Sequence, residues 1–170
     1  MILVTVGTHD QQFDRLVKGA DQIAAELDER VIIQRGCSNY LPSIAEHFQW
    51  TSSQRMEALT AESRLVISQA SAGAIILAIR MEKPLILVPR LRRYRENHND
   101  HQLQLAQALE EIGRAVVVAE PTARMLQSAI EQCTKNNFRI MGDNHLQKSL
   151  KQLLENWSGS SLTLNPEVEH

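Results

Sequence analysis

Small and polar residues that suit a phosphate follow the first apolar run of the chain. Residues 2–6 are mostly apolar and β-branched, and Gly7, Thr8, His9 and Asp10 come directly after them. A strand, a glycine turn and a helix in this order are typical of a phosphate site, because the helix N-terminus offers unpaired N–H groups and the positive end of its dipole. A plain tight turn is the alternative, with Thr8 or Asp10 capping the helix. No Walker lysine follows Gly7, which argues against a P-loop NTPase.

A second stretch of small residues precedes an apolar helical pattern. Residues 68–74 read Ser-Gln-Ala-Ser-Ala-Gly-Ala, and such small residues let a ligand approach the backbone at a helix N-terminus. Tight packing of a helix on a sheet has the same composition and stays the alternative. A further loop follows residues 31–34, where Gly36 predicts a turn and Tyr40 is either a ligand contact or a half-buried packing residue.

The segment 89–102 carries the highest density of charged and hydrogen-bonding groups. Its sequence is PRLRRYRENHNDHQ, with Arg90 among four arginines in a chain of net charge −2. Such a run forms either a solvated loop or a contact with a diphosphate, an anionic membrane or a partner. Residues 97–102 then bring more polar groups to a helix start than a cap at Asn99 or Asp100 requires. We interpret the excess as recognition of a polyhydroxyl ligand.

Metal chemistry and nucleophilic catalysis are not expected. His98 and His101 stand beside Asp100, but no other compact cluster of metal ligands is visible in the sequence. No Ser–His–Asp order and no nucleophile elbow occurs. Cys37 and Cys133 form no CxxC pair and are expected to be free thiols.

Short apolar runs alternate with amphipathic stretches, which predicts the elements that hold these loops. The expected strands cover residues 2–6, 31–34, 48–50, 64–68, 84–88 and 115–118. The expected helices begin near residues 13, 52, 72, 99, 123 and 146. This alternation predicts a Rossmann-like α/β fold, a mostly parallel sheet with helices on both faces. Ligands bind such sheets at the carboxyl ends of the strands, which is where the polar loops fall.

Length and charge limit the class of protein. The chain has 170 residues, enough for one domain, and its net charge of −2 argues against a general nucleic-acid-binding protein. No run approaches the roughly 18 apolar residues of a membrane span, and the apolar N-terminus is too short for a signal sequence. We expect one domain over residues 1–158 and a flexible tail over 159–170, in a cytoplasmic protein.

Five segments together resemble the C-terminal domain of family 28 glycosyltransferases. They are VTVGTHDQQFDRLV, IIQRGCSNYLP, SRLVISQASAGAIILAI, KPLILVPR and NHNDHQLQLAQALEEIG, and they span about residues 1–120 in the family's order and spacing. The chain resembles in particular the small, split members. These are the bacterial PssE-type subunits and the cytosolic subunit of the eukaryotic enzyme that adds the second N-acetylglucosamine to dolichol-linked sugar.

The resemblance implies a GT-B-type donor domain that binds a UDP-sugar, with no metal and no further cofactor. The family's glycine loop matches Gly7–His9, its SHAGAGS turn at the diphosphate and ribose matches residues 68–74, and its DHQ segment at the donor sugar matches 100–102. The UDP-sugar site expected in this chain comprises Gly7, Thr8, His9, Ser68, Gln69, Ser71, Ala72, Gly73, Ala74, Pro89, Asn99, Asp100, His101 and Gln102.

The chain departs from the family pattern at three positions. Gln69 replaces the family histidine, and Ser71 replaces the first glycine of the turn. Leu77 stands where the family commonly has the acidic residue that holds the ribose. Because leucine accepts no hydrogen bond, the ribose is held elsewhere, or nucleotide affinity is weaker, or the donor differs.

The resemblance also implies a partner, because the chain begins directly with the donor domain. We expect a two-component inverting glycosyltransferase, in which a membrane-anchored subunit brings a lipid-linked glycan acceptor and holds this chain at the inner face of the membrane. His9 and His101 are the candidates for the general base in this chain, and we favour a base in the partner. A non-catalytic stabilising subunit and a nucleotide-sensing module remain alternatives, as does a homo-oligomer of the isolated chain.

Overall fold

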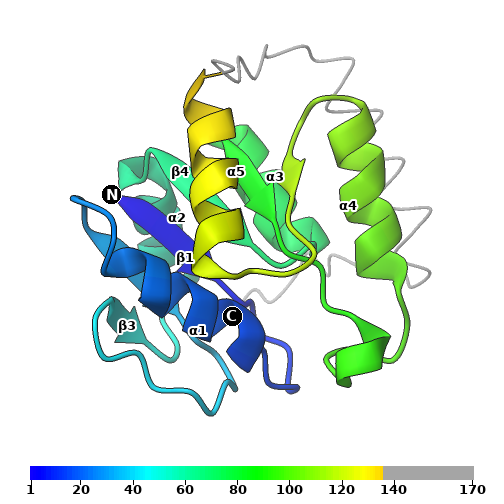
Figure 1. Ribbon diagram of the computed structural model, residues 1–170, viewed down its shortest axis with the longest axis horizontal. Helices are drawn as coiled ribbons and strands as arrows, with labels where there is room; N and C mark the ends of the chain where they lie inside the picture. Colours follow the sequence, from blue (N-terminus) through cyan, green and yellow to red (C-terminus); the bar gives the residue numbers. More distant parts are fainter. Residues whose placement is uncertain (136–170) are drawn as a thin grey trace, which may run out of the picture. The chain divides into compact units, whose positions relative to one another are not determined.

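Six parallel strands form one sheet in a computed structural model of the chain, which describes residues 1–135 (Figure 1). The strand order is β3-β2-β1-β4-β5-β6. The strands are β1 (Ile2–Thr5), β2 (Val31–Gln34), β3 (Glu46–Phe48), β4 (Leu65–Ser68), β5 (Leu85–Leu87) and β6 (Val116–Val117). Strands β2 and β3 follow β1 toward one edge of the sheet, and β4, β5 and β6 continue from β1 toward the other edge. The sheet order therefore reverses between β1 and β4.

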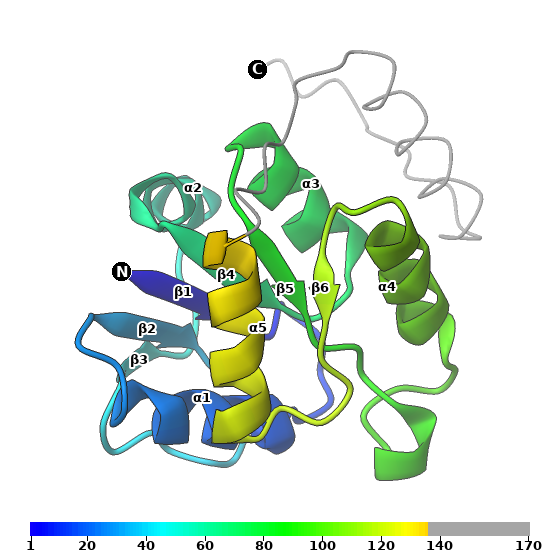
Figure 2. The ribbon, with the colours of Figure 1, turned by 45° about the horizontal axis from the view of Figure 1, so that its top comes forward.

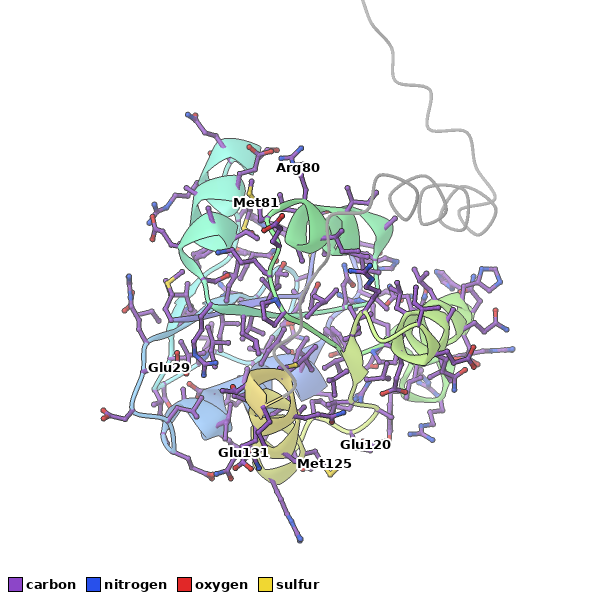
Figure 3. The ribbon with its side chains drawn as sticks, turned by 90° about the horizontal axis from the view of Figure 1, so that it is seen from above. Glu29, Arg80, Met81, Glu120, Met125 and Glu131 are labelled. Atoms are coloured by element: carbon purple, nitrogen blue, oxygen red, sulfur yellow. The ribbon has the colours of Figure 1, made fainter. Side chains whose placement is uncertain are left out.

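Helices cover both faces of this sheet. The helices are α1 (Asp14–Ala24), α2 (Ser53–Glu62), α3 (Ala72–Arg80), α4 (His101–Glu111) and α5 (Ala123–Lys135), with a short 3-10 helix η1 (Arg92–Tyr94). Figures 2 and 3 show α1 and α5 on one face and α2 and α3 on the other. Helix α4 packs beside β6. The helices that follow β1 and β4 therefore lie on opposite faces of the sheet.

The alternation of side chains along β1 joins the two layers to the sheet. Ile2, Val4 and Val6 are fully buried in the core shared with α1 and α5. Leu3 points the other way and packs with Leu59 of α2. Successive residues of a strand face opposite sides, so a strand covered on both faces is apolar at nearly every position. This explains why β1 shows as a continuous apolar run in the sequence.

The expected fold class is confirmed, and each strand predicted from the sequence is present within two residues of its expected position. Gly113 follows α4 with φ +68°, as expected of a residue that ends a helix. The described helices also begin within two residues of their expected starts. The suggested caps of the first helix are wrong, because α1 begins at Asp14 and neither Thr8 nor Asp10 caps it. The helix expected near 146–157 and the tail 159–170 lie outside the described residues.

The buried carboxylate of Asp21 holds the loop between β2 and β3. It accepts hydrogen bonds from the Tyr40 hydroxyl and from the N–H groups of Ser43, Ile44 and Ala45, at 2.8–2.9 Å. Burial alone would raise the pKa of Asp21, but the hydrogen bonds from these four groups lower it below its ordinary value. Tyr40 therefore has a packing role in this loop, as one of the two alternatives predicted.

Replacing Asp21 by asparagine is expected to destabilise the fold by about 2–3 kcal/mol at neutral pH, because an amide nitrogen leaves buried N–H donors without an acceptor. A carboxylate with a lowered folded pKa contributes its full stability above the unfolded pKa of about 3.9 and loses it as the pH falls. The difference in unfolding free energy between wild type and Asp21→Asn, measured with urea, should therefore be smaller at pH 3 than at pH 7. The exposed Asp28→Asn is the control, and equal gaps at both pH values would contradict the account.

Candidate functional site

A cleft of about 730 Å³ opens at the carboxyl ends of β1, β2 and β4 and continues between α2 and α3. Polar residues line its mouth at the strand ends, among them Gly7, Gln34 and Gln69. Apolar residues line its other half, among them Trp50 and Leu77. The cleft lies where the strand order reverses, which is the usual ligand position in an open parallel sheet.

The loop after β1 is fixed by the side chain of Gln34. Gly7 donates its N–H to Gln34 Oε1 at 3.0 Å, and Gln34 Nε2 donates back to the Gly7 carbonyl at 2.9 Å. The Thr5 hydroxyl also donates to Gln34 Oε1, at 2.6 Å. The Gly7 N–H is therefore already occupied and does not offer itself to a phosphate. This loop forms a rigid wall of the cleft.

The glycine at position 7 is required by its surroundings. Its φ is +71°, and a Cβ there would lie 1.9 Å from Nε2 of Gln69. Gln69 cannot swing aside freely, because its Oε1 accepts a hydrogen bond from Arg90 Nε at 2.6 Å. Glycine at position 7 thus allows the loops after β1 and β4 to contact each other closely.

The N-terminus of α3 is the part of the cleft best suited to an anion. Ser71 precedes the helix in an extended conformation and makes no side-chain capping bond. The first N–H groups of a helix have no partner within the helix. A Cβ on Gly73 would meet nothing within 4 Å, so Gly73 is not required by packing inside the chain. Gly73 and Ala74 line the cleft, and the helix presents bare backbone to it.

His9 is the candidate base that lines the cleft. Its Nδ1 accepts the Gln11 N–H at 3.2 Å and lies 3.0 Å from Asp10 Oδ1. Nδ1 makes only one of these two interactions at a time. It needs a lone pair to accept the Gln11 N–H and a proton to bind the Asp10 carboxylate. Burial, then the charge of Arg90 and His98, lower the pKa of His9, and Asp10 opposes them. The ring is therefore mostly neutral at pH 7.

The similarity of this chain to known proteins extends over the whole described region. A family model described as the glycosyltransferase family 28 C-terminal domain matches residues 1–156.

The chain belongs to glycosyltransferase family 28.

Two curated relatives agree with this membership. A UDP-N-acetylglucosamine--N-acetylmuramyl-(pentapeptide) pyrophosphoryl-undecaprenol N-acetylglucosamine transferase of Prochlorococcus marinus (strain MIT 9312) is 29% identical over 149 residues, which cover 82% of this chain and 39% of that one. The chain spans 28% of the same-named protein of strain MIT 9215. These curated relatives are thus much longer than the part that this chain matches.

Solved structures share the fold. The solution structure of ALG13 superposes with a TM-score of 0.61 and 21% identity, covering 90% of this chain and 94% of that one. The calicheamicin glycosyltransferase CalG4 superposes with a TM-score of 0.60 and 17% identity, covering 93% of this chain and 39% of that one. At these identities the likeness concerns the fold alone, which this chain shares with glycosyltransferases of the GT-B type.

The cleft of this family 28 domain brings together eight of the expected site residues. They are Gly7, Thr8, His9, Gln69, Ser71, Gly73, Ala74 and Gln102. The other six do not line it. Ser68 is buried and donates to the Gln69 carbonyl. Pro89 is also buried, and Ala72 is the first residue of α3.

Three of the six lie at the start of α4. The Asn99 side chain accepts the His101 N–H at 3.2 Å, and Asp100 Oδ1 accepts the Arg92 N–H at 3.0 Å. Asn99 and Asp100 thus use part of their hydrogen-bonding capacity within the loop. His101 is exposed outside the cleft lining, which leaves His9 as the better placed of the two histidines.

The arginine run in this segment does not form a solvated loop as a whole. Arg90 is completely buried. Arg93 pairs with Glu120, and Glu96 of the same segment is buried and pairs with Arg15 at 2.8 Å. The Tyr94 hydroxyl also donates to Glu120. Part of the run therefore builds the loop instead of contacting a ligand directly.

Sequence reasoning missed the apolar half of the cleft. Trp50, 46% exposed, follows β3, and its ring packs over the position where Gly36 would carry a Cβ. Glu57 of α2 is the one acidic side chain that lines the cleft within residues 1–135, and it pairs with Arg80 of α3 at 2.6 Å. Figure 3 labels Arg80 at the outer side of this helix layer. A tryptophan at the end of the strand predicted over residues 48–50 was the available signal for this half.

Among residues 1–135, no three His, Cys, Asp or Glu side chains come together as metal ligands would. No helix in the same part of the chain combines the length and the apolar character that crossing a membrane requires.

Proposed function

We propose that this chain is the donor-binding part of an inverting glycosyltransferase and that its cleft holds a UDP-sugar. One observation carries the proposal: the bare, glycine-containing N-terminus of α3 opens into a large cleft at the point where the strand order reverses. A helix N-terminus without a capping side chain favours a phosphate through its N–H groups and its dipole. Membership of family 28 supports a sugar nucleotide as the ligand.

The two halves of the cleft suit the two ends of a nucleoside diphosphate. We expect the diphosphate at the N-terminus of α3, with the amide groups of Gln69 and Gln102 close by. We expect the uracil ring of the nucleotide in the apolar half, where the exposed ring of Trp50 offers a stacking surface. Leu77 cannot bind ribose hydroxyls. Glu57, which pairs with Arg80, is the carboxylate that the cleft offers as an acceptor within residues 1–135.

The reaction that fits this arrangement is a displacement at the anomeric carbon. An acceptor hydroxyl oxygen bonds to that carbon while the bond to the UDP oxygen breaks, and a base removes the hydroxyl proton. Negative charge grows on the leaving diphosphate, and the helix N-terminus stabilises it. His9 is neutral at pH 7 and lines the cleft, so it is the candidate base in this chain; a base in a partner is the alternative that we favour.

The acceptor side of the reaction is proposed to come from a membrane-anchored partner subunit. The curated relatives, whose names include a pyrophosphoryl-undecaprenol acceptor, are longer than this chain, which spans 28–39% of their length. ALG13 matches this chain over 94% of its own length, so a protein of similar extent exists in the same fold. A lipid-linked glycan acceptor and a position at the inner membrane face follow from such a partner.

Calorimetry with UDP and a panel of UDP-sugars tests the donor site. The proposal predicts binding in the micromolar to millimolar range, and transfer of sugar when the partner subunit and acceptor membranes are added. No binding at millimolar UDP would contradict it and favour a stabilising subunit. Binding without transfer in the complete system would instead favour a nucleotide sensor.

Removing the aromatic ring at position 50 is expected to weaken binding of the uracil ring and to leave binding of the diphosphate unchanged. Trp50→Ala should lower the affinity for UDP and for uridine by about 5- to 30-fold, because stacking on an aromatic ring contributes about 1–2 kcal/mol. Affinity for inorganic pyrophosphate should not change. Leu41→Ala, another exposed apolar residue but outside the cleft, is the control. Full uridine affinity in Trp50→Ala would mean that the uracil ring does not stack on Trp50.

A further inference from the structure

Arg90 is a charged residue that the proposed reaction does not use and that no solvent reaches. Its Nη1 donates to the carbonyls of Gln11 and Gln12 at 3.0 and 2.9 Å, and its Nη2 donates to the Val6 carbonyl at 3.1 Å. Its Nε donates to Gln69 Oε1 at 2.6 Å. The guanidinium also stacks on the Phe13 ring, 4.6 Å from the centroid. One side chain thus ties the loop after β1 to the loop after β4.

No carboxylate within residues 1–135 is hydrogen-bonded to Arg90. Its hydrogen-bond acceptors in this part of the chain are neutral carbonyl or amide oxygens. The buried carboxylate of Glu96 lies near, but both its oxygens bind Arg15, at 3.0 and 2.8 Å. Arg15, Arg90 and Glu96 together carry one net positive charge. An uncompensated charge away from water is costly, and an anion bound close by would offset that cost.

Burial lowers the pKa of Arg90 to about 10, and the charges of Glu96, Cys37 and Asp10 work against this decrease. The guanidinium therefore still carries its charge at neutral pH. The lowered pKa agrees with the geometry: the group is desolvated more than it is compensated.

Arg90 orients two amide side chains of the cleft, Gln69 through its guanidinium and Gln102 through its backbone N–H. Its Nε can only donate, so the oxygen of Gln69 faces it and the NH2 group lies on the side of Gly7. Its backbone N–H donates to Gln102 Oε1 at 3.1 Å, which leaves the NH2 group of Gln102 as a donor. Both glutamines line the cleft. Two NH2 donors are thus fixed at the end where we expect the diphosphate.

We propose that Arg90 is the positioning residue of the phosphate end of the cleft: its guanidinium fixes the NH2 donor of Gln69 and supplies a buried positive charge to a diphosphate that it does not touch. The inference rests on the proposed function, because it takes a nucleoside diphosphate as the ligand. Arg90 lies outside the cleft lining and would act on the charged diphosphate but not on the uncharged nucleoside. Arg90 should therefore matter for UDP and not for uridine.

The test compares UDP with uridine in the wild type and in Arg90→Met, by NMR titration under conditions where both proteins are folded. We expect Arg90→Met to lower the ratio of UDP affinity to uridine affinity about tenfold, the size of the interaction between unit charges about 10 Å apart at an effective dielectric constant of about 20. Uridine affinity should stay within about twofold. Arg90→Lys keeps the charge without the forked donors and should recover part of the ratio.

Two control variants separate this role from loss of stability and from loss of charge elsewhere. Asp21→Asn destabilises the fold without touching Arg90, and Arg64→Met removes a cation whose partner is Glu29. Both should keep the wild-type ratio of UDP to uridine affinity. An Arg90→Met protein with that same ratio would overturn the inference and leave the proposed function intact. Absence of UDP binding to the wild type would overturn the proposed function itself.

A wild-type measurement covers the case in which Arg90→Met does not fold. The Nε–H signal of Arg90, assigned by its loss in Arg90→Lys, should shift on addition of UDP and not on addition of uridine. A purely structural arginine would respond to neither or to both. An Nε–H signal that stays in place at saturating UDP would therefore also overturn the inference.

Discussion

Gly73→Asp is expected to stabilise the isolated fold and to abolish UDP binding. Gly73 lies in the first turn of α3, and a Cβ there meets no other atom within 4 Å. Replacing glycine within a helix and placing a carboxylate at its N-terminus together contribute about 1 kcal/mol to folding. The same carboxylate would enter the cleft where we expect the diphosphate. Repulsion and blocked approach should lower UDP affinity at least about a hundredfold.

The opposite signs of the two effects make this substitution informative. Urea unfolding measures the stability, and calorimetry measures UDP affinity. Met125→Asp is the matched control, because it adds the same charge to the first turn of α5 on the other face of the sheet, at an exposed position. It adds the contribution of a carboxylate at a helix N-terminus without the gain from removing a glycine, so it should raise stability less than Gly73→Asp and leave UDP affinity unchanged. Full UDP affinity in Gly73→Asp would remove the N-terminus of α3 from the site.

Gly7→Ala is expected to destabilise the fold by about 3–4 kcal/mol and to weaken UDP binding. A residue other than glycine at φ +71° costs about 1–2 kcal/mol. The new Cβ also displaces Gln69, whose side chain lies 1.9 Å from it. The buried guanidinium of Arg90 then loses an acceptor, which costs about 2 kcal/mol more. Gln69 would no longer present its NH2 group to the cleft.

A second glycine in the same conformation provides the control for this prediction. Gly113 has φ +68°, and a Cβ there meets nothing within 4 Å. Gly113→Ala should therefore show the backbone cost alone, about 1–2 kcal/mol, without loss of UDP affinity. Equal unfolding free energies for the two variants would mean that the contact between Gly7 and Gln69 contributes nothing. Shortening Gln69 to alanine should relieve part of the effect of Gly7→Ala.

The periodicity of the sequence was sufficient to predict the sheet and its helices. Buried parallel strands such as β1 and β4 are apolar at nearly every position, so they stand out from the amphipathic helices. The reversal of strand order then follows from common connection rules. The helix starts were predicted within two residues, but the group that holds the start of α1 was not. Helix α1 begins at Asp14 because Ser38, from a distant loop, accepts the N–H of Phe13 at 3.1 Å.

The candidate site was predicted in part, for a related reason. Residues directly after strands converge by topology alone, so Gly7, Gln69 and Gly73 were foreseeable members of one cleft. The burial of Arg90 was not foreseeable, since its acceptors are backbone carbonyls far away in the sequence. Nor was the apolar half, which needs α2 and α3 to lie side by side. The composition of α2 gave no hint of this, because it is mostly polar.

The most direct test of the donor site is an N–H NMR titration of the wild-type chain with UDP. We expect the largest shift changes on the amides of Ser71 to Ala74, with further changes at His9, at the Gln69 and Gln102 side chains, and on the indole N–H of Trp50. The backbone amides of α5, that of Met125 among them, should not respond. Saturating UDP that left the α3 N-terminus unchanged, or shifted only residues on the α1 and α5 face, would contradict the central claim.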